Sequence, residues 1–566
     1  MTTVDEDIAG AIDGGKSFIL DAGAGAGKTY SLVEALRHLL RERGSQLRSR
    51  GQQIACITFT NVAKDEIAER IGHDPLVRVS TIHDFLWDAI AGHQRALRRI
   101  LPMYNLMMKP ARQKDPDELA AALPAVAVTY SDRGSNLLKG RLHHDDVLNV
   151  ARLMFTEHPI LSRLTAAKFP FLFVDEYQDT SRAVIETILG TLLPKSEGLL
   201  VVGLFGDKLQ NIYHGGEHPG VGEIPVELSA PLQTIVKTDN RRCSRAVINL
   251  LNRIRTDIEQ VPAADNAEGS AIYIQPGLTG QDGLDRANQF LAEARRWPAE
   301  RKELYLTHRL IGRKAGYADL LQLYSDRQGF HKEAFTRGDD EAIAFFMEQI
   351  EPLAAAWTAG RSGQILSFLK RRGYALTTND DKRKTRLALD HLVEARNTAS
   401  IGSVLSHVHQ TGLLALPEEI ILRLAGGTIE VDAEVPKLVE REELSRTFYA
   451  GLFALPYAQV VAYAAFFFSD HTPYATKHGV KGAEFDNVLV ILDDEGANWN
   501  IYSFSKYLSG EDAKRNEKRW NRTRNIFYVC CSRPRVNLAI IDLAARSVAK
   551  DARVRELFGA DNTFFL

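Results

Sequence analysis

The stretch Ser17-Phe18-Ile19-Leu20-Asp21-Ala22-Gly23-Ala24-Gly25-Ala26-Gly27-Lys28-Thr29 decides the fold. Residues 17–20 are mostly apolar and predict a short buried strand. Residues 21–27 form a loop of small residues, and residues 28–41 have the pattern of a helix. A strand, a glycine-rich loop and a helix in this order predict a phosphate-binding loop, with Ala22 standing where the strict pattern has glycine.

The chemistry of this loop follows from its residue types. Small residues allow the backbone N–H groups of residues 22–29 to wrap phosphate groups, and the helix N-terminus favours negative charge. We expect Lys28 to neutralise the β- and γ-phosphates and Thr29 to offer its hydroxyl to Mg²⁺. The loop therefore predicts binding of a nucleoside triphosphate with Mg²⁺.

A second acidic element completes the expected site. The apolar run at residues 171–174 predicts a buried strand, and Asp175 and Glu176 follow it directly. We expect Asp175 to be a ligand of Mg²⁺ and Glu176 to polarise the attacking water.

Buried strands alternate with helical patterns along the chain. Further strands are expected at residues 54–59, 199–205, 271–275, 304–307, 488–492 and 537–541. This alternation predicts an α/β fold with parallel sheets. We expect two RecA-like parallel-sheet P-loop cores, each with a mainly helical insertion. The expected boundaries are 1–87 and 166–245 for the first core, 88–165 for its insertion, 246–313 and 455–566 for the second core, and 314–454 for its insertion.

Composition narrows the class of protein. The chain has 566 residues, 45% of them hydrophobic, which suits several globular domains. No apolar run approaches the ~20 residues of a membrane helix, and the four cysteines form no C-x-x-C pair, so we expect a reducing, cytoplasmic setting without a membrane. With 70 Lys and Arg against 72 Asp and Glu, any nucleic-acid contact must come from a local groove. Basic clusters at residues 37–50, 95–114, 382–386 and 514–524 are either such contacts or solvated helix faces.

An ordered set of seven short motifs resembles superfamily 1A DNA helicases of the UvrD/Rep/PcrA type. Beyond the phosphate loop, the matching segments are 58–63 with Glu66, 81–85, 175–179, 206–213, 240–242, 476–486 and 524–533. The short chain is also similar to the helicase component of Gabija-type anti-phage systems.

The resemblance implies further roles at the nucleotide. Gln210 would sense the γ-phosphate, and Arg242 and Arg533 would reach it from the second core as arginine fingers. Glu484 would contact the nucleotide sugar or the γ-phosphate network. The family's adenine-reading Gln has no counterpart in residues 1–16, and Arg241 replaces its aromatic residue in the fourth core motif. We therefore expect loose selectivity for the base.

The resemblance also implies a DNA track. Its backbone-gripping residues would be Thr60, Asn61, Thr81, His83, Thr476 and His478. Phe85 and Tyr213 would stack on bases. Alternatives remain for three of these residues: core packing for Phe85, core packing or a role near the nucleotide for Tyr213, and an internal hydrogen bond for His83.

Taken together, the motifs predict an ATP- and Mg²⁺-dependent helicase or translocase that moves 3′ to 5′ on single-stranded DNA or a tailed duplex. Its setting would be DNA repair and recombination, or anti-phage defence beside a partner nuclease. The alternative is a regulatory, DNA-stimulated ATPase subunit of a nuclease complex that does not unwind duplexes. The C-terminal segment 561–566 would either pack on its own core or dock on a partner.

Overall fold

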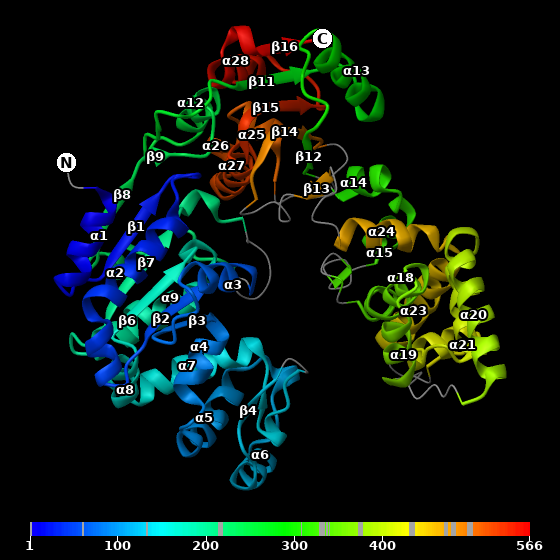
Figure 1. The fold of residues 1–566 in the computed structure, drawn as a ribbon, viewed down its shortest axis with the longest axis horizontal. Coiled ribbons are helices and arrows are strands. Elements are labelled where there is room, and N and C mark those ends of the chain that lie inside the picture. Colours follow the sequence, from blue (N-terminus) through cyan, green and yellow to red (C-terminus); the bar gives the residue numbers. More distant parts are fainter. Residues whose placement is uncertain are drawn as a thin grey trace. The chain divides into compact units, whose positions relative to one another are not determined.

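The computed structural model describes residues 3–58, 61–131, 134–212, 219–306, 308–327, 334–335, 338, 340–371, 377–429, 436–468, 474–476, 483–494 and 502–566. The chain divides into two compact units (Figure 1). The first contains Met1–Arg301, Val480–Val490 and Trp499–Leu566, and the second contains Lys302–Gly479 and Ile491–Asn498. The two are described separately below.

The first sheet of the first unit is parallel throughout. Its strands are β1 (Phe18–Ala22), β2 (Ile54–Thr58), β3 (Val77–Thr81), β6 (Phe171–Asp175), β7 (Val201–Gly206) and β8 (Gln233–Lys237). Their spatial order is β3-β2-β6-β7-β1-β8. The inner strands are buried on both faces, as parallel strands covered by crossover helices require. Because the strands are parallel, their carboxyl ends meet at one edge, and the phosphate loop and Asp175 share that edge.

Helices cover both faces of this sheet. On one face lie α1 (Val4–Asp13) and α2 (Lys28–Ser49), and their apolar residues join the rings of Phe18, Phe173 and Phe205. These rings pack edge to face, with centroids 5.6–6.1 Å apart. The other face contacts α4 (Ile82–Ile90) and α9 (Arg182–Thr187).

The segment between β3 and β6 is mainly helical. Its helices are α5 (Gln94–Met107), α6 (Pro116–Ala122), α7 (His144–Glu157) and α8 (Pro159–Lys168). A two-stranded parallel ribbon of β4 (Thr129–Tyr130) and β5 (Arg141–Leu142) accompanies them. Apolar residues of these helices continue the core on the α4 face.

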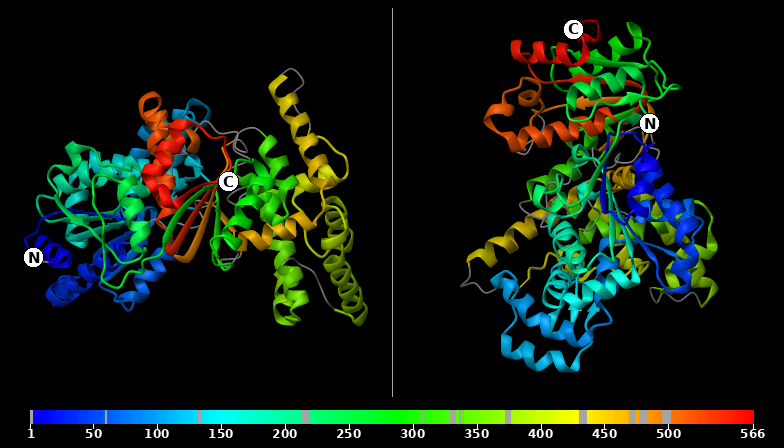
Figure 2. Two further views of the ribbon diagram at one scale, coloured as in Figure 1. Left: turned by 90° about the horizontal axis from the view of Figure 1, so that it is seen from above. Right: turned by 90° about the vertical axis from the view of Figure 1, so that its left-hand side faces the viewer.

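A second sheet in the same unit uses strands from distant parts of the chain. In the order β14 (Phe485–Leu492), β15 (Pro534–Asp542), β11 (Ser270–Gln275) and β16 (Thr563–Phe565), they lie side by side (Figure 2). Strand β11 is parallel to both of its neighbours. Helices α12 (Arg245–Ile254) and α28 (Val548–Phe558) pack on this sheet, and α27 (Glu517–Cys531) packs on α12. The C-terminal segment thus pairs with its own core through β16.

The described residues of the second unit are mainly helical, and its strand β12 (Lys302–Tyr305) pairs in parallel with β13 (Tyr474–Thr476). Its longer helices are α20 (Asn379–Thr398), α21 (Ile401–Thr411), α23 (Pro436–Ala454) and α24 (Ala458–Phe468). Two RecA-like parallel-sheet cores with mainly helical insertions confirm the predicted fold class.

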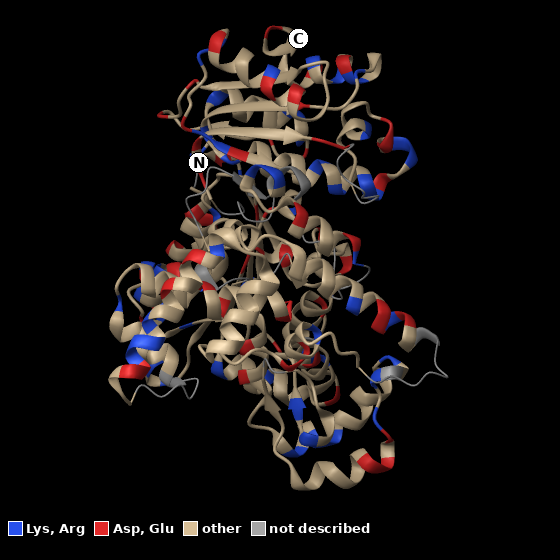
Figure 3. Ribbon diagram, turned by 90° about the vertical axis from the view of Figure 1, so that its right-hand side faces the viewer, with Lys and Arg blue, Asp and Glu red and all other residues tan. Residues whose placement is uncertain are grey.

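Charge and polarity agree with the composition. Figure 3 shows Lys and Arg interspersed with Asp and Glu along the helices of both units. In α20, three basic residues of the 382–386 cluster pair with Asp380 or Asp390 on the same helix, which favours the solvated-face interpretation there. All four cysteines are buried and free. Among the described residues, no helix is long and apolar enough to cross a membrane.

Candidate nucleotide and nucleic-acid site

The phosphate loop has the backbone that its sequence predicts. Strand β1 ends at Ala22 and α2 begins at Lys28. Gly25 and Gly27 have φ of 77° and 76°, the left-handed region that glycine adopts without strain. A Cβ on Gly25 would lie 2.7 Å from Oδ1 of Asn240 and 2.8 Å from Cβ of Arg242. Glycine is therefore required both by conformation and by the close approach of the segment around Asn240.

The two acidic residues are presented by the end of β6. Asp175 is its last residue, and Glu176 follows with φ of 49°, an uncommon conformation for a non-glycine residue that marks functional positions. This turn brings Oε1 of Glu176 to 4.0 Å from Nζ of Lys28. Burial and the neighbouring Glu176 carboxylate raise the pKa of Asp175, and Lys28 opposes them. A divalent cation would offset the same repulsion, so Asp175 fits the oxygen ligand that Mg²⁺ prefers, with the Thr29 hydroxyl available at the start of α2.

Gln178 links this acidic pair to the end of β7. Its side-chain amide donates to Glu176, and its Oε1 accepts from the backbone N–H of Asp207 at 3.1 Å. Asp207 in turn accepts from Nε2 of Gln210 at 3.1 Å. Gln210 is thus connected to Glu176 through two buried residues, Gln178 and Asp207. Sequence reasoning assigned no role to Gln178, although it stands between the two acids and the next motif.

Both predicted arginine fingers lie in the first unit, with Arg242 against the phosphate loop and Arg533 close enough to Arg242 to feel its charge. Arg242 stands two residues after Asn240, and its Nε donates to Oε1 of Glu484 at 2.7 Å. Arg533 is 1% exposed and donates to the carbonyl of Val529 at 2.9 Å. Burial and the nearby Arg242 lower the pKa of Arg533 to about 10, with Glu176 acting in the opposite direction. A bound phosphate would relieve this cost of burying a cation.

Glu484, which the resemblance assigns to the nucleotide sugar or the γ-phosphate network, pairs with an arginine. In this structure it holds the guanidinium of Arg242, which accords with membership of the γ-phosphate network.

A buried polar network joins the loop to the second sheet, and sequence reasoning did not find it. The hydroxyl of Tyr528 accepts from N–H of Ala24 at 3.0 Å and from Nε2 of Gln260 at 2.9 Å. It also donates to Asp207 at 3.3 Å. Asn240 donates to the carbonyl of Ala24 and to Gln260, both at 2.8 Å. All of these residues except Gln260 lie inside matched motifs, but only the folded chain shows that they meet.

Arg255 anchors the same network from the end of α12. Its fully buried guanidinium lies 2.8 Å from Asp207, 3.2 Å from Asp21 and 3.0 Å from Asp257. Burial by itself would lower the pKa of Arg255, but Asp207 and the other partners raise it further than burial lowers it. The charge is therefore retained in the interior.

The structure describes only some of the residues predicted to contact DNA. Thr60, Tyr213 and His478 lie outside the described residues. Asn61 begins α3 (Asn61–Arg70), and Thr476 ends β13 in the second unit. Thr81 caps α4 by accepting from N–H of Asp84 at 3.3 Å.

Phe85 and His83 differ in exposure on the same helix. Phe85 is 1% exposed and packs on Phe169 with ring centroids 5.6 Å apart. The prediction that this ring stacks on bases is therefore wrong, and the alternative of core packing is confirmed. His83 is half-buried, and its ring meets that of His144 at 4.9 Å. It remains a candidate for the DNA track.

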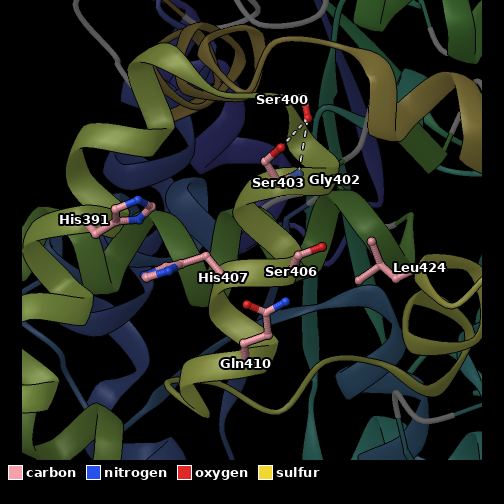
Figure 4. Close-up of a pocket in the computed structure, with 8 residues that line it drawn as sticks. All are labelled: His391, Ser400, Gly402, Ser403, Ser406, His407, Gln410 and Leu424. Carbon is pink, nitrogen blue, oxygen red and sulfur yellow. Dashed lines mark hydrogen bonds between the residues drawn. The ribbon is translucent and has the colours of Figure 1, made fainter.

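A pocket of about 640 Å³ lies apart from these motifs, in the second unit. It is lined by α20 and α21 through residues that include His391, Ser403 and His407 (Figure 4). The imidazole of His407 is hydrogen-bonded to the carbonyl of Ala388 at 2.8 Å. None of the residues that line it belongs to the predicted site.

Comparisons with known proteins agree with the motifs. A family model described as an AAA domain matches residues 8–216. The Gabija protein GajB of Bacillus cereus (strain HuB5-5) is 24% identical over 98% of this chain and 96% of its own length. The ATP-dependent DNA helicase PcrA of Staphylococcus aureus (strain Mu50 / ATCC 700699) is 26% identical over 47% of this chain, and PcrA of Bacillus subtilis (strain 168) is 24% identical over 45%.

The matches differ in extent. They span 42% and 39% of the two PcrA proteins, so this chain covers less than half of their length. A crystal structure of the Pif1 helicase from Candida albicans aligns over 58% of this chain and 55% of its own at 14% identity and a TM-score of 0.28, too weak a likeness to support an argument. The chain is therefore UvrD/PcrA-like in its motifs and Gabija-related along nearly its whole length, and these relatives support a nucleotide-binding, ATP-hydrolysing role of the helicase type.

Proposed function

We propose that this protein is an ATP- and Mg²⁺-dependent motor that moves 3′ to 5′ on single-stranded DNA and unwinds tailed duplexes. One observation supports the motor most directly: Arg242, from the segment after the first sheet, lies against Gly25 of the phosphate loop and is close enough to Arg533 to lower the pKa of Arg533. Arginines that contact the triphosphate can couple hydrolysis to movement, because contacts made with the triphosphate are lost with the γ-phosphate.

The roles of the individual residues follow from their positions. Lys28 holds the β- and γ-phosphates, and Thr29 and Asp175 hold Mg²⁺, which supplies charge neutralisation when bound. Glu176 orients and polarises the attacking water, assisted by Gln178. Arg242 and Arg533 stabilise the charge that develops on the transferred phosphoryl group. Gln210 communicates the state of the γ-phosphate through Asp207.

On the DNA side, we propose that Asn61, Thr81 and His83 contribute to a backbone-gripping track with Thr60, Thr476 and His478, and that Tyr213 stacks on bases. The structural organisation that we propose is 1–87 with 166–245 and 246–313 with 455–566 as the two motor cores. Residues 88–165 and 314–454 are their insertions.

ATP hydrolysis with and without single-stranded DNA tests the motor. Lys28→Ala is expected to abolish turnover, because no other loop residue supplies the charge. Strand separation on duplexes with a 3′ tail or a 5′ tail tests polarity. Separation with the 5′ tail alone would contradict the proposed direction.

A second function is favoured by one observation, the match to GajB over 98% of this chain against 47% for PcrA. In this alternative the protein is a regulatory, DNA-stimulated ATPase subunit beside a partner nuclease in anti-phage defence, and it separates no strands. Stimulation of hydrolysis by DNA without unwinding of either tailed duplex would support the regulatory subunit. Unwinding by the isolated chain would support the motor, with repair, recombination or defence as its setting. Purification of the native protein with its companions would distinguish a nuclease complex from a free enzyme.

A further inference from the structure

A buried lysine lies next to the phosphate loop and has no role in the site described so far. Lys237 is the last residue of β8 and is only 7% exposed. In the parallel register it stands beside Ala22, the first residue of the loop, and its carbonyl accepts from N–H of Gly23 at 3.4 Å. Lysine is almost never this buried unless a polar or charged group compensates it.

The ammonium group of Lys237 has an oriented polar neighbour. Its Nζ donates to Oγ of Ser31 at 2.6 Å, and Ser31 donates to Oδ1 of Asp5 at 2.6 Å. The ring of Tyr30, which is 54% exposed, lies 5.8 Å from the same Nζ. The chain from Asp5 through Ser31 fixes the position of the lysine and leaves further donor capacity on an ammonium that carries three N–H bonds.

Burial lowers the pKa of Lys237, and nearby Arg241 acts in the same direction, while Asp5 and Asp239 act against it. An anion at this position would therefore stabilise the charged form. The buried ammonium group of Lys237 is therefore suited to bind a negatively charged ligand.

The position of Lys237 differs from that of Lys28. The Lys28 ammonium points towards Glu176, at the end of the site where the γ-phosphate reacts. The Lys237 ammonium lies by Ser31 and Tyr30, and 4.0 Å from where a Cβ of Gly27 would stand. The loop amides cradle the α- and β-phosphates while the loop lysine reaches the β- and γ-phosphates. The part of the nucleotide left for the Gly27 side is its α-phosphate end.

We propose that Lys237 is a second nucleotide-binding lysine, which contacts the α-phosphate of the bound nucleoside triphosphate. Asp5 and Ser31 act as its positioning residues. The inference rests on the proposed nucleotide binding and adds a contact on β8, outside the segments that carry the seven motifs. Because the α-phosphate does not react, the contact strengthens substrate and transition state equally and affects KM rather than kcat.

Binding of MgADP and steady-state hydrolysis of MgATP test the proposal with the full chain. Lys237→Met removes the charge and keeps an unbranched side chain of similar length. The expected result is a rise of about tenfold or more in Kd for MgADP and in KM for MgATP, the usual worth of a hydrogen bond to a charged group, with kcat within about twofold. Lys16→Met is the matched control, because Lys16 is exposed before the start of β1, and wild-type values are expected.

Two further measurements keep the test decisive. If thermal unfolding shows that Lys237→Met is poorly folded, Lys237→Gln takes its place as the test variant. It retains a hydrogen-bond donor to Ser31 without the charge, and the same loss of MgADP affinity is expected. Unchanged MgADP affinity in a folded Lys237 variant would overturn the proposal. A loss for MgADP but not for MgGDP would also overturn it, because the lysine would then contact the base. If the wild type binds neither MgADP nor MgATP, the proposed nucleotide-dependent function fails instead.

Discussion

The hydroxyl of Tyr528 accepts a hydrogen bond from the backbone N–H of Ala24 at 3.0 Å, which fastens helix α27 to the phosphate loop. The two residues are 504 positions apart in the chain. Because the same hydroxyl donates to Asp207, and Asp207 holds Gln210, one atom connects the loop with the residue that we expect to sense the γ-phosphate. The helix that ends near Arg533 is therefore mechanically tied to the loop that it serves.

Tyr528→Phe is expected to weaken this coupling while the ring still fills its place. Loss of the hydroxyl leaves the Ala24 N–H and the Gln260 amide without this acceptor, at a cost of about 1–3 kcal/mol in the free energy of unfolding. We expect kcat for DNA-stimulated hydrolysis to fall by about five- to tenfold, the equivalent of ~1–1.4 kcal/mol. Denaturant unfolding and hydrolysis assays measure the two effects.

Tyr507→Phe provides the control for this variant. Tyr507 is equally buried, but its ring packs on Trp520 and Phe527 and its hydroxyl takes no part in the network. Wild-type kcat is expected. Equal DNA stimulation in Tyr528→Phe and the wild type would show that the hydroxyl contributes to stability alone.

The strands that sequence reasoning found and missed follow a physical rule. The inner strands β1, β2, β6 and β7 are buried on both faces and form continuous apolar runs. Strands β3, β8 and β16 are not among those that the sequence predicts, and each is an edge strand of its sheet. Edge strands are partly exposed, so β8 (Gln233–Lys237) buries only Ile235 and Lys237 and has only two apolar residues in a row.

The residues of the site also fall into those that the sequence reveals and those that it does not. Residues that touch the phosphates are recognisable because the chemistry requires particular types at fixed spacing, as in Lys28, Thr29, Asp175 and Glu176. Residues that hold them in place carry no such signature. Arg255 and Gln260 belong to an ordinary helix end and loop until folding places them against Asp21 and Tyr528. Phe85 shows the opposite error, because its motif suggested DNA contact while an amphipathic helix turned it inward.

Arg533→Ala is expected to leave nucleotide binding nearly intact and to reduce hydrolysis by about 10³-fold or more, as removal of an arginine finger does. The guanidinium stabilises charge that develops only in the transition state, so kcat carries the effect. Arg535→Ala is a nearby control, because Arg535 is half-exposed and pairs with Asp486. Normal DNA-stimulated hydrolysis by Arg533→Ala would refute the role of Arg533.

Asp175 predicts a pH-dependent stability of the metal-free protein. Its pKa is raised by burial and by Glu176, so the folded state binds the proton more tightly than the unfolded state does. This contribution to stability is fully present below the ordinary carboxyl pKa of 3.8 and is lost as the pH rises through the higher folded value. Asp175→Asn is therefore expected to raise the Tm of the metal-free protein at pH 8 more than at pH 5.

Magnesium should turn the ionised Asp175 carboxylate from a destabilising into a stabilising group in the wild type. Mg²⁺ with a nucleotide is expected to raise the Tm of the wild type at pH 8 and to raise that of Asp175→Asn much less, because the variant lacks the anionic ligand. Identical stabilisation of both proteins would remove Asp175 from the proposed metal site.

Arg255→Ala is expected to be the most destabilising of these substitutions. The guanidinium is fully buried and lies within 3.2 Å of Asp21 and Asp207, so its removal leaves two acidic groups without their counter-charge. Breaking a buried ion pair in this way costs about 3–5 kcal/mol in the free energy of unfolding. The loss should grow as the pH rises from 5 to 8, because the raised pKa of Asp21 shows that even with Arg255 present burial favours its protonated form.

Arg245→Ala, on the same helix and paired with exposed Glu268, is expected to cost at most about 1 kcal/mol in the free energy of unfolding. A small cost for Arg255→Ala would mean that water enters the network and solvates both carboxylates, in which case the tie between α12 and the phosphate loop is not rigid.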